Sequence, residues 1–195
     1  MAFYRASDLR NDGLRVAARN LTTAEAVLDR RTASISEREV FDIFLSHSFR
    51  DARIILGIAE VLESQGVRVY VDWLVDSQLN RSEVNAATAR LLRKRMGQCK
   101  SLIFATSTSS PSSKWMPWEL GYFDGLNGSN ISIMPIEEHD TPGKYGQEYL
   151  ELYPAIEKLP VKGAGSIAAA VRTDGRAYMG LRDFAQGSNR YIAFA

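Results

Sequence analysis

The stretch "VFDIFLSHSFRDARIILGIAEVLESQGVRVYV", residues 40–71, decides the fold that we predict for this chain. It opens with an apolar run at 40–46 that ends in polar residues, which predicts a buried strand. Apolar residues then recur at helical spacing over 51–66, and Gly66 suits the position just past a helix end. Residues 67–71 are β-branched and aromatic, which predicts a second strand. A strand, a helix and a strand in this order favour a parallel βαβ unit.

The same alternation of strands and helices continues along the chain. We expect further strands at 101–106, at 131–136 and within 152–161, with helices over 80–96 and 117–126. Strands separated by helix-length segments are typical of parallel sheets covered on both sides. The predicted fold class is therefore α/β, with a parallel sheet of about five strands and helices on both faces.

Two flanking segments surround this alternating part. Residues 1–38 are polar with apolar residues at helical spacing, and Thr22 is the expected N-cap of a helix, with Glu25 reaching back to it. The tail contains "SIAAAVRTDGRAYMGLRDF", which has helical composition interrupted by Asp-Gly. We expect an N-terminal helical extension (1–38), a main domain (39–162) and a partly helical C-terminal extension (163–195).

Composition excludes several classes of protein. The 195 residues are 45% hydrophobic and 24% charged, as is usual for a globular domain. A net charge of +1 gives no global attraction for nucleic acid or anionic membranes. Cys99 is the only cysteine, so no internal disulfide forms, and no apolar stretch has the length of a signal peptide or membrane helix. These features predict a cytoplasmic protein without nucleic-acid or membrane partners.

Polar and aromatic residues follow three of the predicted strands. In an open parallel sheet, ligands bind outside the carboxyl ends of the strands, so these residues are the candidates for a site. They suit a ligand with ribose hydroxyls, phosphates and a flat ring. They are Ser46, His47 and Ser48 after the first strand, Asp72 and Trp73 after the second, and Trp115 and Glu119 after the third.

Glu119 has an unusual setting in "SSKWMPWELGYFDG". The carboxylate is predicted to lie on an aromatic and apolar stripe of a helix. The residues of this stripe recur at about one helical turn: Trp115, Glu119, Tyr122 or Phe123, and Leu126. An ionised carboxylate there needs a partner. A ligand hydroxyl or a developing cation would be such a partner.

Each candidate also has a simpler explanation. Ser46 and Ser48 could cap the next helix, and His47 could be an ordinary loop histidine. Trp73 and Trp115 could be packing residues, although their positions after strand ends lead us to expect them beside a crevice rather than in the core. The basic run "RLLRKRMGQCK" suits a helix C-terminus, where cations are favoured. No zinc-ligand spacing occurs, so no metal site is predicted.

Three segments together resemble a TIR domain of the stand-alone bacterial type. "DIFLSHSFRDA" is similar to the family's first strand and turn, "VRVYVDWL" to the strand before the BB loop, and "SKWMPWELGYFDG" to its W-x-x-x-E box. The resemblance covers about residues 39–136, with a weaker extension to 160, and the loop lacks the glycine common in the family. It implies a flavodoxin-like sheet and, in many bacterial members, cleavage of NAD at the nicotinamide–ribose bond.

The resemblance also implies roles for single residues. Glu119 matches the catalytic glutamate and Trp115 the tryptophan four positions before it. Ser46 and His47 match the turn beside the nucleotide, and Trp73 lies where the BB loop begins to line the pocket. We add Asp72 as a substrate-binding candidate because it ends the second strand.

A single carboxylate is chemically sufficient for such a reaction. Ordinary glycosidases need two, because the leaving oxygen must be protonated. Nicotinamide is already a cationic pyridinium in NAD and leaves as a neutral molecule, so Glu119 alone could stabilise the oxocarbenium-like transition state. NAD is then the substrate, and no cofactor is expected.

The resemblance extends to biology and to partners. Similar TIR proteins act in Thoeris-type anti-phage defence, where a cyclic ADP-ribose isomer signals to an effector protein. Self-association is also expected, because a neighbouring chain's BB loop helps to complete the pocket in such enzymes. Leu74, Val75 and Leu79 give this loop an apolar character that is common at contact sites.

Two other functions remain open from the sequence. The chain could be a non-enzymatic TIR interaction module, although a scaffold does not need the Trp115 and Glu119 pair. It could also be a nucleoside-processing glycosyl hydrolase or transferase on a related fold. Incubation with NAD and with nucleosides separates the three, because only the enzymes release nicotinamide or a free base.

Overall fold

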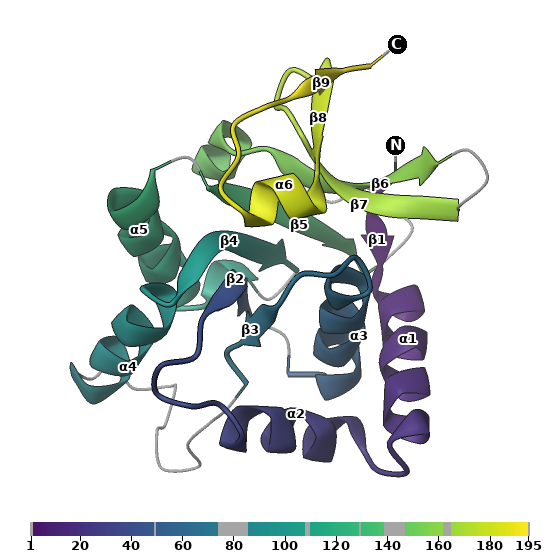
Figure 1. The fold of residues 1–195 in the computed structure, drawn as a ribbon, viewed down its shortest axis with the longest axis vertical. Coiled ribbons are helices and arrows are strands. Elements are labelled where there is room, and N and C mark those ends of the chain that lie inside the picture. The colour runs from purple at the N-terminus through teal and green to yellow at the C-terminus, as the bar shows by residue number, and fades with distance from the viewer. Residues whose placement is uncertain are drawn as a thin grey trace.

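The computed structural model describes residues 2–48, 50–73, 86–107, 110–128, 130–138, 147–161 and 165–194. The strands are β1 (Tyr4–Arg5), β2 (Phe41–His47), β3 (Val69–Val71), β4 (Cys99–Thr106), β5 (Ile131–Glu137), β6 (Ala155–Val161), β7 (Gly165–Val171), β8 (Ala177–Gly180) and β9 (Ile192–Ala193). The α-helices are α1 (Ala6–Arg19), α2 (Ala24–Ala33), α3 (Ala52–Glu63), α4 (Ala86–Met96), α5 (Met116–Asn127) and α6 (Leu181–Ala185). Two short 3-10 helices are η1 (Ser110–Ser112) and η2 (Glu148–Leu152). Figure 1 shows one central sheet with helices around it.

The first half of the sheet is parallel and has the flavodoxin-like strand order. β3, β2, β4, β5 and β6 are neighbours in that order and all run in the same direction. Numbered among themselves, these strands follow the order 2-1-3-4-5 of doubly wound nucleotide-binding folds. The prediction of about five parallel strands with covering helices is confirmed.

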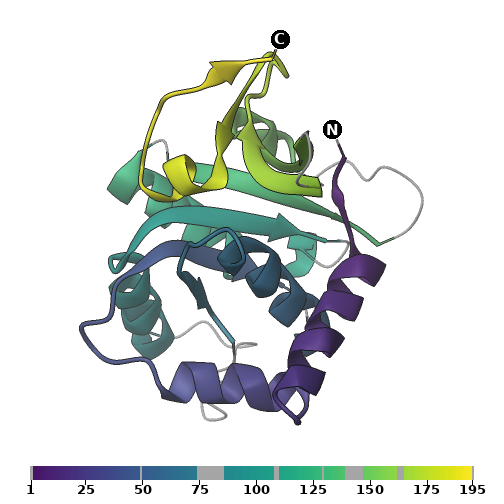
Figure 2. The ribbon, with the colours of Figure 1, turned by 45° about the vertical axis from the view of Figure 1, so that its right-hand side comes forward.

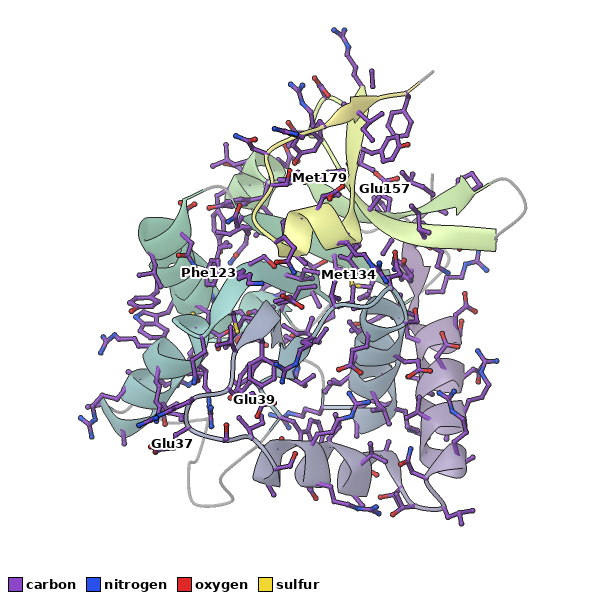
Figure 3. All side chains as sticks on the ribbon, in the orientation of Figure 1. Glu37, Glu39, Phe123, Met134, Glu157 and Met179 are labelled. Carbon is purple, nitrogen blue, oxygen red and sulfur yellow. The ribbon has the colours of Figure 1, made fainter. Side chains whose placement is uncertain are left out.

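Two layers of helices cover the sheet. One hydrophobic cluster joins α1, α2, α3 and α6 to residues such as Leu45, Val71 and Met134, the last of which lies deep in the interior (Figure 3). A second cluster joins α4 and α5 to residues such as Phe44 and Tyr70 on the opposite side of the sheet. We call these sides the α3 face and the α5 face. Side chains of successive residues on a strand therefore point alternately to the α3 face and to the α5 face.

The C-terminal tail differs from its prediction. It holds more strand than helix, because β7, β8 and β9 continue the sheet beyond β6 in antiparallel order, and α6 is the only helix among its described residues. Ala169 and Ala170 favour helices intrinsically, but they are fully buried and pair with Glu157 and Ile156 of β6. Pairing and burial outweigh helix propensity here, and the Asp-Gly sequence makes the turn between β7 and β8, with Gly175 at φ 67°.

The N-terminal extension packs directly on the main sheet and its helices. β1 pairs with β5 in parallel, with Tyr4 opposite Ile136. α1 lies alongside α3 in both ribbon views (Figure 1, Figure 2). At their crossing, a Cβ added to Gly13 would lie 1.9 Å from the carbonyl oxygen of Arg53 in α3. The two helix backbones are therefore in direct contact, which only glycine permits.

The N-cap residues of α2 and α3 differ from those considered from the sequence. Thr23, rather than Thr22, caps α2, and its hydroxyl accepts a hydrogen bond from the Ala26 amide at 3.2 Å. The cap of α3 is Asp51, whose carboxylate accepts from the Arg53 amide at 3.0 Å. The alternative in which Ser46 or a neighbouring serine caps α3 is therefore wrong.

The basic run of α4 makes contacts within the chain. Arg93 lies over the Trp118 ring, with 5.4 Å between the guanidinium carbon and the ring centroid. Lys94 forms an ion pair with Glu37, and Arg95 lies over the ring of Tyr70. These cations stabilise the fold, as the simpler explanation of the run predicts. The predicted start of this helix, at residue 80, lies outside the described residues.

Asp51 links α1 to α3 and makes stability depend on pH. Desolvation raises the pKa of its carboxyl group, but hydrogen bonds from Arg53 and Arg10 outweigh this and lower the pKa from 3.8 to about 2. A lowered pKa stabilises the fold above pH 4, and this contribution is lost as the pH falls from about 4 to about 2.

We expect Asp51→Asn to lower the free energy of unfolding by roughly 1 kcal/mol at pH 7, since the amide still caps α3 but the charge is gone. The difference from the unmodified protein should shrink to about half by pH 3. Urea denaturation at both pH values measures it, with Glu151→Gln, at an exposed acid in η2, as control. A difference that stays constant between pH 7 and pH 3 would contradict the charge effect.

Candidate functional site

The carboxyl ends of β2 and β4 form the switch point of this sheet. β2 lies between β3 and β4, so the connection from β2 to β3 leads to one side of β2 and the later strands are added on the other side. Open α/β sheets bind ligands outside the strand ends where the order reverses in this way. Ser46 pairs in register with Phe104 of β4, and Leu45 pairs with Val71 of β3. Asp72, the next residue after Val71, therefore lies level with Ser46 at the same edge.

Glu119 reaches this edge from the first turn of α5. Its side chain is 2% exposed, and the Ser46 hydroxyl donates a hydrogen bond to its Oε2 at 2.5 Å. The two residues are 73 positions apart in the chain, so the fold creates this contact. The helix dipole favours a negative charge in a first turn, and Pro117 lies in that first turn, where its nitrogen needs no hydrogen-bond partner.

The aromatic residues around Glu119 divide into two groups. Trp115 and Phe123 are buried on the side of α5 that faces the sheet, and Phe123 lies where the helix meets it (Figure 3). Trp118 and Tyr122 stack on each other farther out, with 5.5 Å between their ring centroids. The predicted stripe continues to Leu126, and this part is wrong, because Leu126 is 47% exposed.

Trp115 offers a polar group as well as a ring. Its Nε1 is buried, and among the residues that the structure describes it has no hydrogen-bond partner. Buried donors in proteins are normally satisfied by protein, water or a ligand. The Trp115 carbonyl also accepts a hydrogen bond from the Glu119 amide at 2.8 Å, so the two residues are held in one helical turn.

Three serine hydroxyls gather beside this point. Ser48 was a candidate from the sequence, whereas Ser107 and Ser110 were not named individually. The Ser48 oxygen lies 3.2 Å from that of Ser107 and 3.3 Å from that of Ser110. The Ser110 hydroxyl also accepts from the Ser107 amide at 2.8 Å. The signal in the sequence was the serine-rich loop after the third predicted strand. A cluster of hydroxyls suits ribose or phosphate oxygens.

The structure does not bring Trp73 to the other candidates. Side chains alternate along a strand, so Asp72 follows Tyr70 toward the α5 face while Trp73 follows Val71 toward the α3 face. Trp73 is 7% exposed, and its indole Nε1 donates to Asp29 Oδ1 at 3.0 Å. Sequence reasoning missed Asp29, because nothing local in α2 indicates this contact.

His47 is separated from Glu119 for the same reason. It is buried and is the residue next to Ser46 on β2, so alternation directs it to the α3 face. The expectation that Trp73 and Trp115 lie outside the core is also wrong, because both are packed in hydrophobic clusters. The α5 face thus holds Ser46, Asp72 and Glu119 with Trp115.

The remaining features of the described residues point to no other centre for chemistry. No group of three or more His, Cys, Asp or Glu side chains among them is placed to hold a metal ion. No helix in the ranges given above has the length and apolar character needed to cross a bilayer. A cavity of about 400 Å³ lies beside α2 at the amino ends of β2 and β3, lined in part by Phe41 and Val69. It contains none of the predicted site residues.

Comparison with known proteins decides the family. No family model matches the chain. TIR2 of Cytobacillus dafuensis, provisionally named a cyclic ADP-D-ribose synthase, is 33% identical over 90 residues, which is 46% of this chain and 24% of TIR2. ThsB' of Bacillus cereus (strain MSX-D12), named a probable 3' cyclic ADP-D-ribose synthase, is 38% identical over 192 residues, covering 95% of this chain and 99% of ThsB'. The chain belongs to the TIR family, together with ThsB'.

The resemblance to a TIR domain, which rested on three short segments of sequence, is thus confirmed, and the similarity to ThsB' covers 95% of this TIR protein. The similarity to ThsB' includes both extensions of this TIR protein, which the sequence resemblance did not cover. The chain spans about a quarter of the length of TIR2. A solved structure of a metazoan TIR-STING receptor from C. gigas also matches, with a TM-score of 0.41 and 15% identity, over 82% of this chain and 43% of that one.

Proposed function

We propose that this TIR protein cleaves NAD at the nicotinamide–ribose bond and forms a cyclic ADP-ribose product. The observation that carries the proposal is the buried contact between Ser46 and Glu119 at the switch point of the sheet. It is supported by the similarity to ThsB' over almost the full length of both chains, since ThsB' is named for the synthesis of a cyclic ADP-ribose.

The chemistry needs one well-held carboxylate. The bond between C1′ of the ribose and the nicotinamide nitrogen breaks, and its electron pair leaves with the now neutral nicotinamide. Positive charge develops on the ribose, and Glu119 stabilises it in a setting where water does not screen the interaction. Ser46 fixes the carboxylate through Oε2, so that little reorganisation is needed as the charge develops.

Burial of the carboxylate favours a cyclic product over hydrolysis. Glu119 and Ser46 are both buried, which limits the access of water to the reacting carbon. A nucleophile in the adenosine part of the same molecule then attacks C1′, and Glu119 takes the proton that it loses. Nicotinamide and a cyclic ADP-ribose isomer are the two products.

Other residues of the switch point bind the rest of the substrate. The Trp115 indole contacts a flat base or donates its N–H to the ligand, and Asp72 binds ribose hydroxyls beside Ser46. The hydroxyls of Ser48, Ser107 and Ser110 donate hydrogen bonds to the phosphate oxygens. Trp73 and His47 act from the α3 face, behind the residues that contact NAD.

The proposed biology follows from this product. A cyclic nucleotide made in the cytoplasm signals to an effector protein in anti-phage defence. Copies of the chain associate through the loop 74–79, which lies outside the described residues, and association completes the pocket. Specific activity measured over a wide dilution series tests this part, since a strictly monomeric enzyme would show constant specific activity.

The reaction itself is tested by incubating the purified protein with NAD and analysing the nucleotides by mass spectrometry. We expect nicotinamide together with a product lighter than ADP-ribose by one water. ADP-ribose alone would contradict the cyclisation, and a free base released from nucleosides would favour a nucleoside hydrolase. No turnover at any protein concentration, with or without lysate of phage-infected cells, would favour an interaction module.

We expect Ser46→Ala to lower kcat for nicotinamide release roughly tenfold, with a smaller effect on KM. The Glu119 carboxylate then loses the donor that orients it, but it keeps its charge. Ser132→Ala is the matched control, because Ser132 is also fully buried in the sheet and its hydroxyl has no hydrogen-bond partner among the described residues. Unchanged kinetics in a folded Ser46→Ala protein would remove this contact from the mechanism.

A further inference from the structure

A hydrogen bond connects the N-terminal extension to the edge of the candidate site. Trp73 Nε1 donates to Asp29 Oδ1 at 3.0 Å, across 44 positions of sequence. Trp73 packs in the cluster of the α3 face, while the Asp29 carboxylate lies at the surface of α2. A bond from an indole N–H to an ionised carboxylate is stronger than one between neutral groups.

The carboxyl end of β3 needs an anchor of this kind. β3 has three residues and pairs only with β2 among the described strands, so its end is held by the sheet from one side. Asp72 directly follows β3 and faces α5, whereas Trp73 faces α3. An anchored indole at 73 therefore fixes the direction in which the side chain at 72 points, because the two share a peptide unit.

α2 is itself firmly placed and can serve as the support. Val27 and Leu28 are buried against the cluster of the α3 face. Arg31 Nη1 lies 2.9 Å from Glu63 Oε2 at the end of α3, which ties the last turn of α2 to that helix. A displacement of Trp73 would therefore cost its hydrogen bond to α2 and its packing in the cluster of the α3 face.

We propose that Asp29 is a positioning residue of the NAD-cleaving site, and that it acts through Trp73 to hold Asp72 level with Ser46 and facing Glu119. The proposal rests on the proposed function and on the part of Asp72 in substrate binding. Glu119 and Ser46 lie on other elements, so the loss of Asp29 weakens substrate binding and leaves the chemical step largely intact. The N-terminal extension thereby takes part in substrate recognition without touching the substrate.

The test compares Asp29→Ala with Asp29→Asn, whose amide oxygen can still accept from the indole. We expect Asp29→Ala to raise KM for NAD roughly tenfold with kcat within about twofold, and Asp29→Asn to restore KM to near the original value. Glu25→Ala, another exposed acid one turn earlier on α2, is the matched control and should behave as the unmodified protein.

A second readout separates this proposal from the proposed function. Hydrogen exchange of the Trp73 indole proton, followed by ¹⁵N NMR, should be faster in Asp29→Ala than in Asp29→Asn or the unmodified protein. Faster exchange with unchanged KM would overturn the positioning role, and so would an equal rise of KM in both Asp29 variants. Absence of nicotinamide release by the unmodified protein would instead refute the proposed function.

Discussion

Replacing Glu119 by Gln is expected to slow nicotinamide release from NAD by roughly 100-fold or more. The amide has nearly the same shape, and its oxygen can still accept the hydrogen bond from Ser46. The negative charge is lost, however, so the positive charge that develops on the ribose is no longer stabilised. The effect should appear in kcat, since the interaction is made mainly in the transition state.

The measurement is the initial rate of nicotinamide release together with a thermal melt of each protein. Glu151→Gln, which changes an exposed acid in η2, is the control and should keep full activity. The melting temperature of Glu119→Gln should remain close to that of the unmodified protein, because a buried neutral amide is accommodated without a charge to pair. Near-normal activity in a folded Glu119→Gln protein would exclude Glu119 from the mechanism.

Replacing Gly57 by Ala is expected to lower the free energy of unfolding by roughly 3 kcal/mol or more. A Cβ at this position would lie 1.9 Å from the carbonyl oxygen of Leu9 in α1. The neighbouring atom belongs to a helix backbone and cannot rotate away, so α1 must move off α3. Gly13 makes the reciprocal contact with the Arg53 carbonyl, and both contacts would open together.

Urea denaturation and limited proteolysis of α1 measure this effect. Gly125→Ala in α5 is the matched control, since a Cβ there meets nothing within 4 Å. Alanine is favoured over glycine in a helix, so this control should be stabilised by up to about 1 kcal/mol. If Gly57→Ala proves as stable as Gly125→Ala, the backbone contact between α1 and α3 is wrong.

The parallel half of the fold could be predicted because its signals are local. Apolar runs and helical spacing lie within each segment, and the rule for open sheets then directs attention to the strand ends. Ser46 and Glu119 were found in this way, although they are far apart in the chain. Their hydrogen bond is the contact that the rule implies.

The incorrect or missing predictions concern contacts between segments that are far apart in the sequence. Ala169 and Ala170 form a strand because β6 is beside them, and Gly13 and Gly57 matter only because their helices cross. Trp73 could have been assigned to the α3 face by continuing the alternation from Val71, so here the strand-end rule was applied too broadly. Asp29 has no local feature that indicates its partner.

The pairing of β1 with β5 has a consequence for the order in which the protein matures. Ala2 and Tyr4 are synthesised well before their partners, Lys158 and Ile136. At ordinary rates of synthesis they wait roughly ten to thirty seconds for these partners. α1 can dock on α3 much earlier, so the nascent chain carries a helix already in place with an untethered strand ahead of it. β1 thus completes its pairing only after β5 and β6 have been made, although the helix that follows it docks much earlier.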